Sequence, residues 1–580
     1  MSRYYTREKN TQVVIALLKA RGIRNVIASP GNTNTALVGS IQHDPSFKVY
    51  SAVDERSAAY MACGLAAETG APVVISCTGA TASRNYLPGM TEAYYRKLPV
   101  LAITSSQILS KVGHHSAQLI DRSVVPNDVA MLSVALPVIK DDDDLWECEI
   151  KVNQAILALT RRGGGPVHIN LPTTYSTPFD VKELPTFRLI DRITPSDAFP
   201  SLSGKVAVLV GAHKAWSSQE TDALDRFCAA TGAVVFCDHT SGYKGKYSLL
   251  YALASGQEVH DFTDDRPDIL IHIGEITGDY FNLGISAKKH VWRVSEDGEM
   301  RDTFRKLRYV FEMPESTFFS HYSQQNGPDN EGYLQNCRAT LGEFRSKIPD
   351  LPFSNIWVAS RLAHRIPSGS VIHFGILNSL RAWNFFDLPP TVTSASNVGG
   401  FGIDGGVSSL IGASLADAEK LYYMVTGDLA FFYDMNIVGN RHVGRNVRIL
   451  LVNNGKGTEF RQYNHHAAHF GDDADEFVAA AGHFGNKSST LVRHYAENLG
   501  FEYFAASHEE EFQAVYERFL LSDMTDRPML FEVFTDSVLE SKALQAILNI
   551  EQDIKGRAKQ LAKRWLGESG VKTLKKLVRD

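Results

Sequence analysis

The stretch that most constrains the fold runs from Val425 to Phe460. An apolar run that ends at Thr426 is typical of a buried strand, and Gly427 and Asp428 follow it directly. A helical segment comes next, and a second apolar run at residues 447–452 predicts a neighbouring parallel strand. Buried parallel strands joined through helices belong to sheets that are covered on both faces. We therefore expect an α/β fold built from doubly wound parallel sheets.

Polar residues gather where these two predicted strands end. Asp428 follows the first strand, and Asn453-Asn454-Gly455-Lys456-Gly457 follows the second. Ligands bind at this carboxyl edge of open α/β sheets. Carboxylate and amide oxygens suit Mg²⁺, which proteins usually share with phosphate groups, and glycines allow the backbone to approach a phosphate. A Gly-Asp pair alone is typical of a capped strand-to-helix turn. The second polar cluster, 26 positions after Asp428, favours a metal–diphosphate site.

This arrangement resembles the diphosphate signature of thiamine diphosphate (ThDP) enzymes. The resemblance implies that Asp428, the Asn454 side chain and the Lys456 carbonyl hold Mg²⁺. Many members have glycine at the position of Lys456, a change that a backbone ligand tolerates. The other cofactor contacts that the resemblance implies are Glu55, Gly79, Asn378, Ser379, Phe401, Ile403, Gly427, Leu429, Ala430, Gly457 and Thr458.

Glu55 is the candidate for the carboxylate that drives the cofactor. In ThDP enzymes a carboxylate beside N1′ of the aminopyrimidine favours the imino form that removes the C2 proton, while the protein supplies geometry and electrostatics. By the residues alone, Glu55 fits equally well as an acid at a helix N-terminus, where the helix dipole favours it. The run from Asp54 to Ala66 resembles the glutamate region of the family. Ile403, within Gly399–Gly405, resembles the apolar wedge that bends the cofactor; a glycine-rich structural loop is the alternative.

Length and strand–helix alternation predict several domains in the 580 residues. We expect a pyrimidine (PYR) domain at 1–184, a middle domain at 201–345 and a diphosphate (PP) domain at 350–545, the last with a strand at 391–394. A basic helical extension is expected at 546–580. The resemblance implies a homodimer or homotetramer with active sites between subunits, where Glu55 of one chain meets Asp428 of the other.

The composition is ordinary for a soluble globular protein. Hydrophobic residues make up 44% and charged residues 21% of the chain, with a net charge of −6, so nothing favours a nucleic-acid partner. No apolar run is long enough to cross a bilayer, and the start of the chain lacks a signal-peptide core. The six cysteines are scattered without metal or disulfide spacing. We expect a cytoplasmic location.

Within the ThDP enzymes, the chain resembles the MenD synthases of menaquinone biosynthesis most. The matching segments are SPGNTNTALV, DERSAAYMACGLA, CTGATASRNYLPG, SNVGGFGIDGGVSS and GDLAFFYDMN. The resemblance extends to about residue 545 and is weakest in the middle domain. That family decarboxylates 2-oxoglutarate on ThDP and adds the succinyl unit to isochorismate.

The substrate-reading arginines of that family are replaced in this chain. Their positions hold Thr33, Val398 and Trp383, with Arg381 nearby, and a basic pair of the family aligns with Asp279-Tyr280. Arginine reads carboxylates because its planar fork pairs with both oxygens. The replacements predict that the cofactor chemistry is kept while the substrates change, so that the chain is not a menaquinone enzyme.

Other residues are candidates to handle substrates and protons. His114 and His115 resemble the paired histidines of ThDP decarboxylases, and a histidine near neutral pKa is a suitable acid–base group; two exposed loop histidines are the alternative. Gln118 aligns with a glutamine of the MenD type. One histidine of the 464–469 cluster is expected to face substrate, and a zinc site there is disfavoured. The candidate substrate contacts are Asn32, Thr33, Arg381, Trp383, Val398, Phe460 and His465.

The leading hypothesis is a ThDP- and Mg²⁺-dependent carboligase. It decarboxylates a small 2-oxo acid and adds the acyl carbanion to a carbonyl or enone acceptor. A simple 2-oxo acid decarboxylase is the first alternative, favoured by the His114-His115 pair. A ThDP-fold subunit without turnover is the second, and the intact Glu55, Ile403, Asp428 and Asn454 disfavour it.

Overall fold

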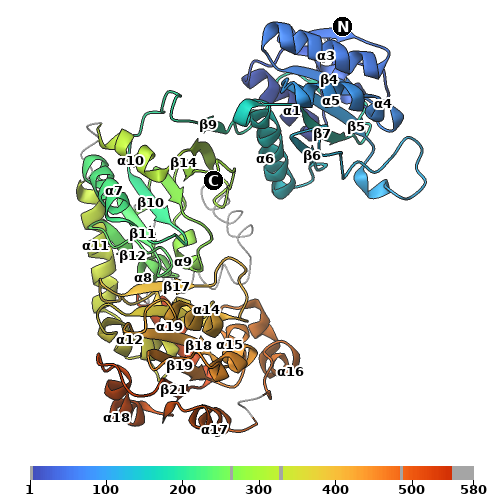
Figure 1. Cartoon of the computed structure of the whole chain (residues 1–580). Helices are drawn as coiled ribbons and strands as arrows, with labels where there is room; N and C mark the ends of the chain where they lie inside the picture. The colour runs from blue at the N-terminus through green and yellow to red at the C-terminus, as the bar shows by residue number, and fades with distance from the viewer. Residues whose placement is uncertain (1–3, 262–264, 325–330, 484–486, 552–580) are drawn as a thin grey trace, which may run out of the picture. The chain divides into compact units, whose positions relative to one another are not determined.

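The computed structural model describes residues 4–261, 265–324, 331–483 and 487–551 (Figure 1). The chain divides into two compact units, one of Met1–Thr194 with Gly298–Val310 and one of Pro195–Asp297 with Phe311–Asp580. Of the basic extension predicted at 546–580, residues 552–580 lie outside the described part of the chain.

The first unit contains a six-stranded parallel sheet. Its strands, in spatial order, are β3 (Lys48–Ser51), β2 (Asn25–Ala28), β4 (Val73–Cys77), β5 (Val100–Ser106), β7 (Val167–Pro172) and β6 (Leu132–Ala135). The helices are α1 (Lys9–Ala20), α2 (Thr35–Ile41), α3 (Glu55–Thr69), α4 (Thr81–Asn85), α5 (Leu87–Tyr95) and α6 (Asp142–Ala158). Separate apolar clusters, one with α1 and α6 and one with α3 and α5, bury the sheet residues.

The second unit contains a parallel sheet formed by residues 206–295. Its strands, in spatial order, are β12 (Ser248–Leu250), β11 (Val234–Cys237), β10 (Val206–Val210), β13 (Ile269–Ile273) and β14 (His290–Ser295). The order reverses between β10 and β13, which is the switch point of a doubly wound sheet. Its helices include α7 (Ser218–Thr231), α10 (Glu315–Ser323) and α11 (Glu331–Ser346).

A further six-stranded parallel sheet of the second unit carries the stretch that constrains the fold. Its strands, in spatial order, are β17 (Thr393–Ser396), β16 (Val371–Phe374), β18 (Tyr422–Gly427), β19 (Val447–Asn453), β21 (Met529–Phe534) and β20 (Glu502–Ala506). Helices of this part are α12 (Asn355–Leu362), α13 (Asn378–Trp383), α14 (Gly406–Ser414), α15 (Asp428–Asp434), α17 (Leu491–Asn498), α18 (Glu509–Phe519) and α19 (Ser537–Leu548). The expected fold class, α/β with doubly wound parallel sheets, is confirmed.

The two predicted strands at the centre of the sequence pattern are β18 and β19, and they pair in parallel. Gly427 lies opposite Val452, so both strands end at the same edge of the sheet. The strand predicted at 391–394 begins two residues later, at Thr393. The reason is local, because the Val392 N–H donates to the Pro389 carbonyl at 3.0 Å and keeps this part of the chain in a turn.

A buried arginine anchors β19. Arg448 is fully buried, and its guanidinium donates to the Tyr423 hydroxyl at 2.6 Å and to the Phe519 and Asp523 carbonyls at 2.9 and 3.0 Å. It also donates to the Leu521 carbonyl. One cation thus satisfies the carbonyls of the segment that leaves α18 and ties that segment to the strand.

Replacing Arg448 is expected to destabilise the fold. Arg448→Met leaves several buried carbonyls without a donor, so we expect a loss of about 3 kcal/mol in the free energy of unfolding. The control is Arg445→Met, because Arg445 forms an exposed ion pair with Glu419 at 3.9 Å and should change that free energy by less than about 1 kcal/mol. Urea unfolding followed by circular dichroism gives the two midpoints. Equal midpoints would contradict the anchoring role of Arg448.

Candidate functional site

A cavity of about 190 Å³ lies at the carboxyl edge of β18 and β19. Most residues predicted from the sequence as cofactor contacts in this unit line it. They are Asn378, Ser379, Ile403, Gly427, Asp428, Leu429, Ala430, Asn454, Lys456, Gly457 and Thr458, and Phe460 lines it as well. The structure therefore brings together four segments that are separate in the sequence, at residues 378–379, 403, 427–430 and 454–460.

Asp428 and Asn454 carry the features expected of cation ligands. Asp428 is buried at the first turn of α15, and burial raises the pKa of this carboxyl group to about 7, against hydrogen bonds from backbone N–H groups that lower it. Asn454 Oδ1 is buried and has no hydrogen-bond partner. A buried carboxylate without a counter-charge and a buried amide oxygen without a donor are both unfavourable, and a hard cation bound between them removes both penalties.

The loop after β19 separates the roles of its residues. The Asn453 side chain donates to Glu532 Oε1 at 2.7 Å and accepts from the Gly455 N–H at 3.2 Å, so it holds the loop in shape. The Lys456 side chain pairs with Asp475 at 2.6 Å, while its carbonyl accepts from the Thr458 N–H at 2.9 Å and keeps a second lone pair. Asn454 and the Lys456 carbonyl are therefore the groups left to bind a ligand.

Two buried acids behind the cavity were not predicted from the sequence. Glu532 accepts from Asn453 and from the Tyr503 hydroxyl, and burial raises its pKa. Glu540 lines the cavity and accepts from the Asn355 N–H at 2.9 Å and the Thr535 hydroxyl at 2.7 Å. Burial raises the pKa of Glu540 to about 7. Each lies in an ordinary strand or helix pattern, so no spacing signal distinguishes it in the sequence.

Two residues near the cavity hold backbone conformations that L-amino acids rarely adopt. Leu377 has a φ of 64° and a ψ of −125° at the start of α13, and Phe401 has a φ of 55°. Such conformations persist where the surrounding structure holds them, and they are concentrated at ligand-binding loops.

The predicted substrate contacts of this unit differ in their burial and in their partners. Trp383 and Val398 are buried, and Val398 packs against the loop at Gly278, where an added Cβ would lie 2.9 Å from Val398 Cγ1. Arg381 is half-buried and pairs with Glu459 at 2.5 Å. Phe460 and His465 lie edge to face, with ring centroids 5.4 Å apart. Burial, with the neighbouring His466, lowers the pKa of His465.

The first unit holds the remaining predicted residues. Glu55 is half-buried at the start of α3, where Asp54 caps the helix by accepting from the Arg56 N–H, and Asn85 Nδ2 donates to Glu55 Oε2 at 3.4 Å. Asn32 is exposed. His114, His115 and Gln118 are exposed in one loop, and His115 and Gln118 have φ values of 55° and 59°.

Thr33 is buried, and its hydroxyl is engaged in hydrogen bonds within the chain. It is 2% exposed, and its hydroxyl donates to the Ser105 carbonyl at 3.1 Å and accepts from the Gly79 N–H at 3.2 Å. It also lies 2.6 Å from the Thr78 hydroxyl. These bonds tie the Thr78-Gly79 turn to the turn that follows β2.

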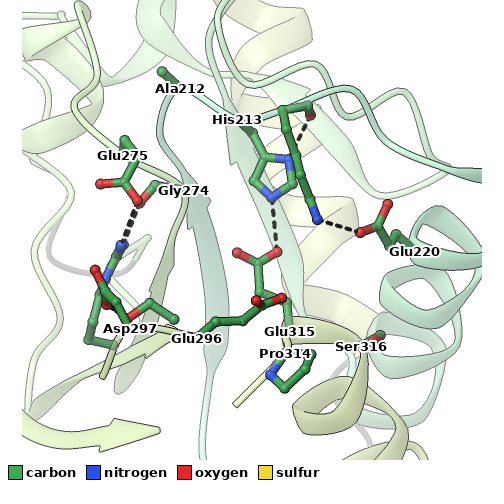
Figure 2. Close-up of a pocket in the computed structure, with 13 residues that line it drawn as sticks. Ala212, His213, Glu220, Gly274, Glu275, Glu296, Asp297, Pro314, Glu315 and Ser316 are labelled. Atoms are coloured by element: carbon green, nitrogen blue, oxygen red, sulfur yellow. Dashed lines mark hydrogen bonds and ion pairs between the residues drawn. The ribbon is translucent and has the colours of Figure 1, made fainter. Parts of the chain in front are cut away.

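A second cavity, of about 390 Å³, lies at the switch point of the sheet formed by residues 206–295 (Figure 2). Three ion pairs among its lining residues join His213 to Glu315, Lys214 to Glu220 and Arg293 to Glu275 at 3.0, 3.2 and 3.5 Å. Figure 2 shows the pair of His213 and Glu315 as a dashed line. Glu220 also closes the N-terminus of α7 in a capping box with Ser217. Because a carboxylate fills the place where a helix would bind a phosphate, this cavity is poorly suited to a dinucleotide.

No described helix is both long and apolar enough to cross a membrane. Among residues 4–261, 265–324, 331–483 and 487–551, no three or more His, Cys, Asp and Glu side chains group in a way that could hold a metal ion.

Known proteins resemble this chain both in its N-terminal part and over nearly its whole length. The family model "Thiamine pyrophosphate enzyme, N-terminal TPP binding domain" matches residues 9–125. The 2-succinyl-5-enolpyruvyl-6-hydroxy-3-cyclohexene-1-carboxylate synthase of Phocaeicola vulgatus is 30% identical over 565 residues, which cover 93% of this chain and 98% of that protein. The enzymes of the same name from Bacteroides fragilis and Flavobacterium johnsoniae are 29% and 27% identical, over 93% and 90% of this chain and 98% and 95% of those proteins.

Cation binding at Asp428 is expected to depend on pH. Its pKa of about 7 exceeds the ordinary 3.8, so without a cation the carboxyl group favours the folded state at low pH, and this contribution is lost as the pH rises through about 7. Mg²⁺ binds the ionised form, so its affinity should fall about tenfold for each pH unit below 7. We expect Mg²⁺ with ThDP to raise the melting temperature more at pH 8 than at pH 6.

Thermal denaturation with and without Mg²⁺ at both pH values measures this difference. Asp428→Asn should abolish the Mg²⁺-dependent rise, whereas Asp417→Asn, at an exposed carboxylate, should leave it unchanged. A rise of the same size at pH 6 and pH 8 would refute the assignment of Asp428 as a ligand.

Proposed function

Because the chain belongs to the family of 2-succinyl-5-enolpyruvyl-6-hydroxy-3-cyclohexene-1-carboxylate synthases, and is thus a ThDP-dependent decarboxylase and carboligase, we propose the following reaction. The protein decarboxylates a 2-oxo acid and joins the remaining acyl unit to a carbonyl or enone acceptor. The observation that carries the proposal is the cavity in which Asp428 and the unpartnered Asn454 Oδ1 meet the glycine loop.

The residues of the cavity fit the diphosphate end of the cofactor. Asp428, Asn454 Oδ1 and the Lys456 carbonyl would hold Mg²⁺, and Gly427 and Gly457 allow phosphate oxygens to approach the backbone. The Thr458 hydroxyl is buried without a partner and is available to the same group. When bound, ThDP supplies the nucleophilic carbon and the electron sink that decarboxylation needs.

The chain's own residues would do the remaining work. Glu55 would share a proton with the pyrimidine ring through its carboxylate oxygen, and Asn85 would orient that carboxylate. Ile403 would support the cofactor from below. Gln118, His114 and His115 are exposed on one loop. Gln118 would contact substrate, and the two histidines would transfer protons.

We propose that the substrates differ from those of the named relatives. Thr33, Val398 and Trp383 stand where the resemblance places substrate-reading arginines, and all three are buried. Neither a hydroxyl engaged in internal hydrogen bonds nor an apolar side chain replaces a guanidinium as a partner for a carboxylate.

The active form would be a homodimer or a homotetramer. Val53, Tyr60 and Met61, beside Glu55, are 80%, 48% and 46% exposed. Exposed apolar side chains that lie close together in the chain favour burial against another protein surface, and a second copy supplies one by symmetry. Glu55 of one protomer would then serve the cofactor bound at Asp428 of its partner.

Carbon dioxide release tests the proposed reaction. The protein with ThDP and Mg²⁺ is given pyruvate, 2-oxoglutarate, branched or aromatic 2-oxo acids, each with and without a mixture of carbonyl acceptors. We expect release from one class of acid, with the acyl carbon joined to an acceptor in the product. Release with free aldehyde as the sole product would favour a simple decarboxylase, and no release from any acid would refute the proposal.

Subunit sharing is tested by mixing two inactive variants. Glu55→Gln and Asp428→Asn should each lose about 100-fold or more in turnover. After co-refolding in equal amounts, half of the dimers are mixed and each has one intact site, so activity should return to about a quarter of the wild-type value. Each variant refolded alone is the control. Activity that stays at the level of the single variants would show that the two residues do not act across subunits.

A further inference from the structure

An arginine near the cavity already binds a carboxylate of its own chain. Arg381, on α13, donates through Nη1 to Glu459 Oε1 at 2.5 Å. The two side chains are 15% and 17% exposed, so the pair is largely withdrawn from water. Glu459 lines the cavity, whereas the sequence pattern marked only its neighbours Thr458 and Phe460.

The other oxygen of Glu459 is held as well. With its amide oriented so that nitrogen faces the carboxylate, Asn378 donates to Glu459 Oε2 at 2.7 Å and accepts from the Glu459 N–H at 3.0 Å. Both carboxylate oxygens therefore have a donor on α13. The pair is a fixed part of the cavity wall, since three hydrogen bonds hold Glu459 in place.

An aromatic ring and a buried acid also lie near Arg381. Its guanidinium lies over the Tyr280 ring at 4.5 Å from the ring centre, and Tyr280 stacks on Phe401 at 6.0 Å. Asp279, the neighbour of Tyr280, is fully buried, and its Oδ2 has no hydrogen-bond partner. Burial raises the pKa of Asp279 to about 7, and the charge of Arg381 acts to lower it.

The nearby cationic side chains that follow β19 are also paired with carboxylates of the chain. Lys456 binds Asp475 at 2.6 Å, and Arg461 binds Asp472 at 2.6 Å and Asp475 at 3.5 Å. The side of the cavity that follows β19 therefore carries cations that are matched to internal carboxylates.

We propose that Glu459 is a built-in anion that occupies Arg381 and excludes substrates with a carboxylate beyond the one released as carbon dioxide. The proposal rests on the proposed function for the reaction and concerns which substrates the site accepts. A substrate carboxylate that bound Arg381 would displace Glu459 and leave its charge half-buried without a counter-charge, which is strongly unfavourable. The Tyr280 ring, which lies under Arg381 and stacks on Phe401, offers no positive charge to a second carboxylate.

Binding of glutarate, a dicarboxylate without a reactive carbonyl, tests the proposal apart from turnover. It is titrated by calorimetry into the protein loaded with ThDP and Mg²⁺. Glu459→Gln removes the internal charge while keeping the size of the side chain, and should bind glutarate about 10-fold or more tightly than wild type. The double variant Glu459→Gln with Arg381→Gln should lose this gain, because Arg381 is the group that is released.

Glu502→Gln is the matched control. Glu502 binds Arg518 through both oxygens at 3.0 and 2.9 Å in an exposed pair, and its replacement should leave glutarate affinity within about twofold of wild type. Melting temperatures verify folding, and Glu459→Ala provides a second variant that removes the same charge. The proposal is overturned if neither Glu459 variant gains affinity, or if wild type already binds glutarate as tightly as they do.

Donor selection separates this inference from the proposed function. In the carbon dioxide assay, wild type should prefer pyruvate to 2-oxoglutarate, and Glu459→Gln should shift the ratio of kcat/KM toward 2-oxoglutarate by about 10-fold or more. A gain in glutarate affinity without release from any acid would reject the proposed reaction and support the role of Glu459. Release with an unchanged ratio and unchanged glutarate affinity would reject the role of Glu459 alone.

Discussion

The candidate site depends on the parallel pairing of β18 and β19. Because Gly427 is in register with Val452, the residues that follow both strands leave the sheet at the same edge. Both strands are almost entirely buried, so their register cannot slip without exposing apolar side chains or burying Asp428 elsewhere. Arg448 adds a polar anchor within β19, where it binds carbonyls after α18. The position of the ligand-binding groups thus follows from the packing of the sheet.

That packing leaves several buried polar groups at the cavity without a hydrogen-bond partner or a counter-charge. The Asn454 and Thr458 side-chain oxygens are buried without partners, and Asp428 is a buried acid with a raised pKa. A fold rarely keeps such groups unless a ligand satisfies them. The adjacent Asn453 shows the contrast, since Glu532 and the Gly455 N–H satisfy its amide. Of these two neighbouring asparagines, Asn453 shapes the loop, whereas Asn454 keeps a buried oxygen available to a ligand.

The sequence predicts the residues of this cavity well because they follow predictable strands. Gly427, Asp428 and Asn454 could be located from apolar runs, and Ile403 from a glycine-rich segment. Glu540 and Glu532 could not, because each belongs to an ordinary helix or strand and meets the site only through tertiary packing. Thr33 was predicted as a substrate contact from its aligned position, yet its hydroxyl is engaged in internal bonds, which a linear pattern does not reveal.

The pairing of Arg381 with Glu459 bears on how the replacement of the other arginines is interpreted. A site that loses its guanidinium groups by drift alone need not neutralise the one that is left, and an unpaired arginine would still attract substrate carboxylates. In this chain Glu459, whose second oxygen accepts from Asn378, pairs with that arginine from within. Removing either partner of a half-buried ion pair leaves the other charge buried without a counter-charge, which is unfavourable. A substitution of one of the two residues is therefore costly while the other is kept. Substitution of the anion readers and internal pairing of Arg381 would act in the same direction, toward substrates with a single carboxylate.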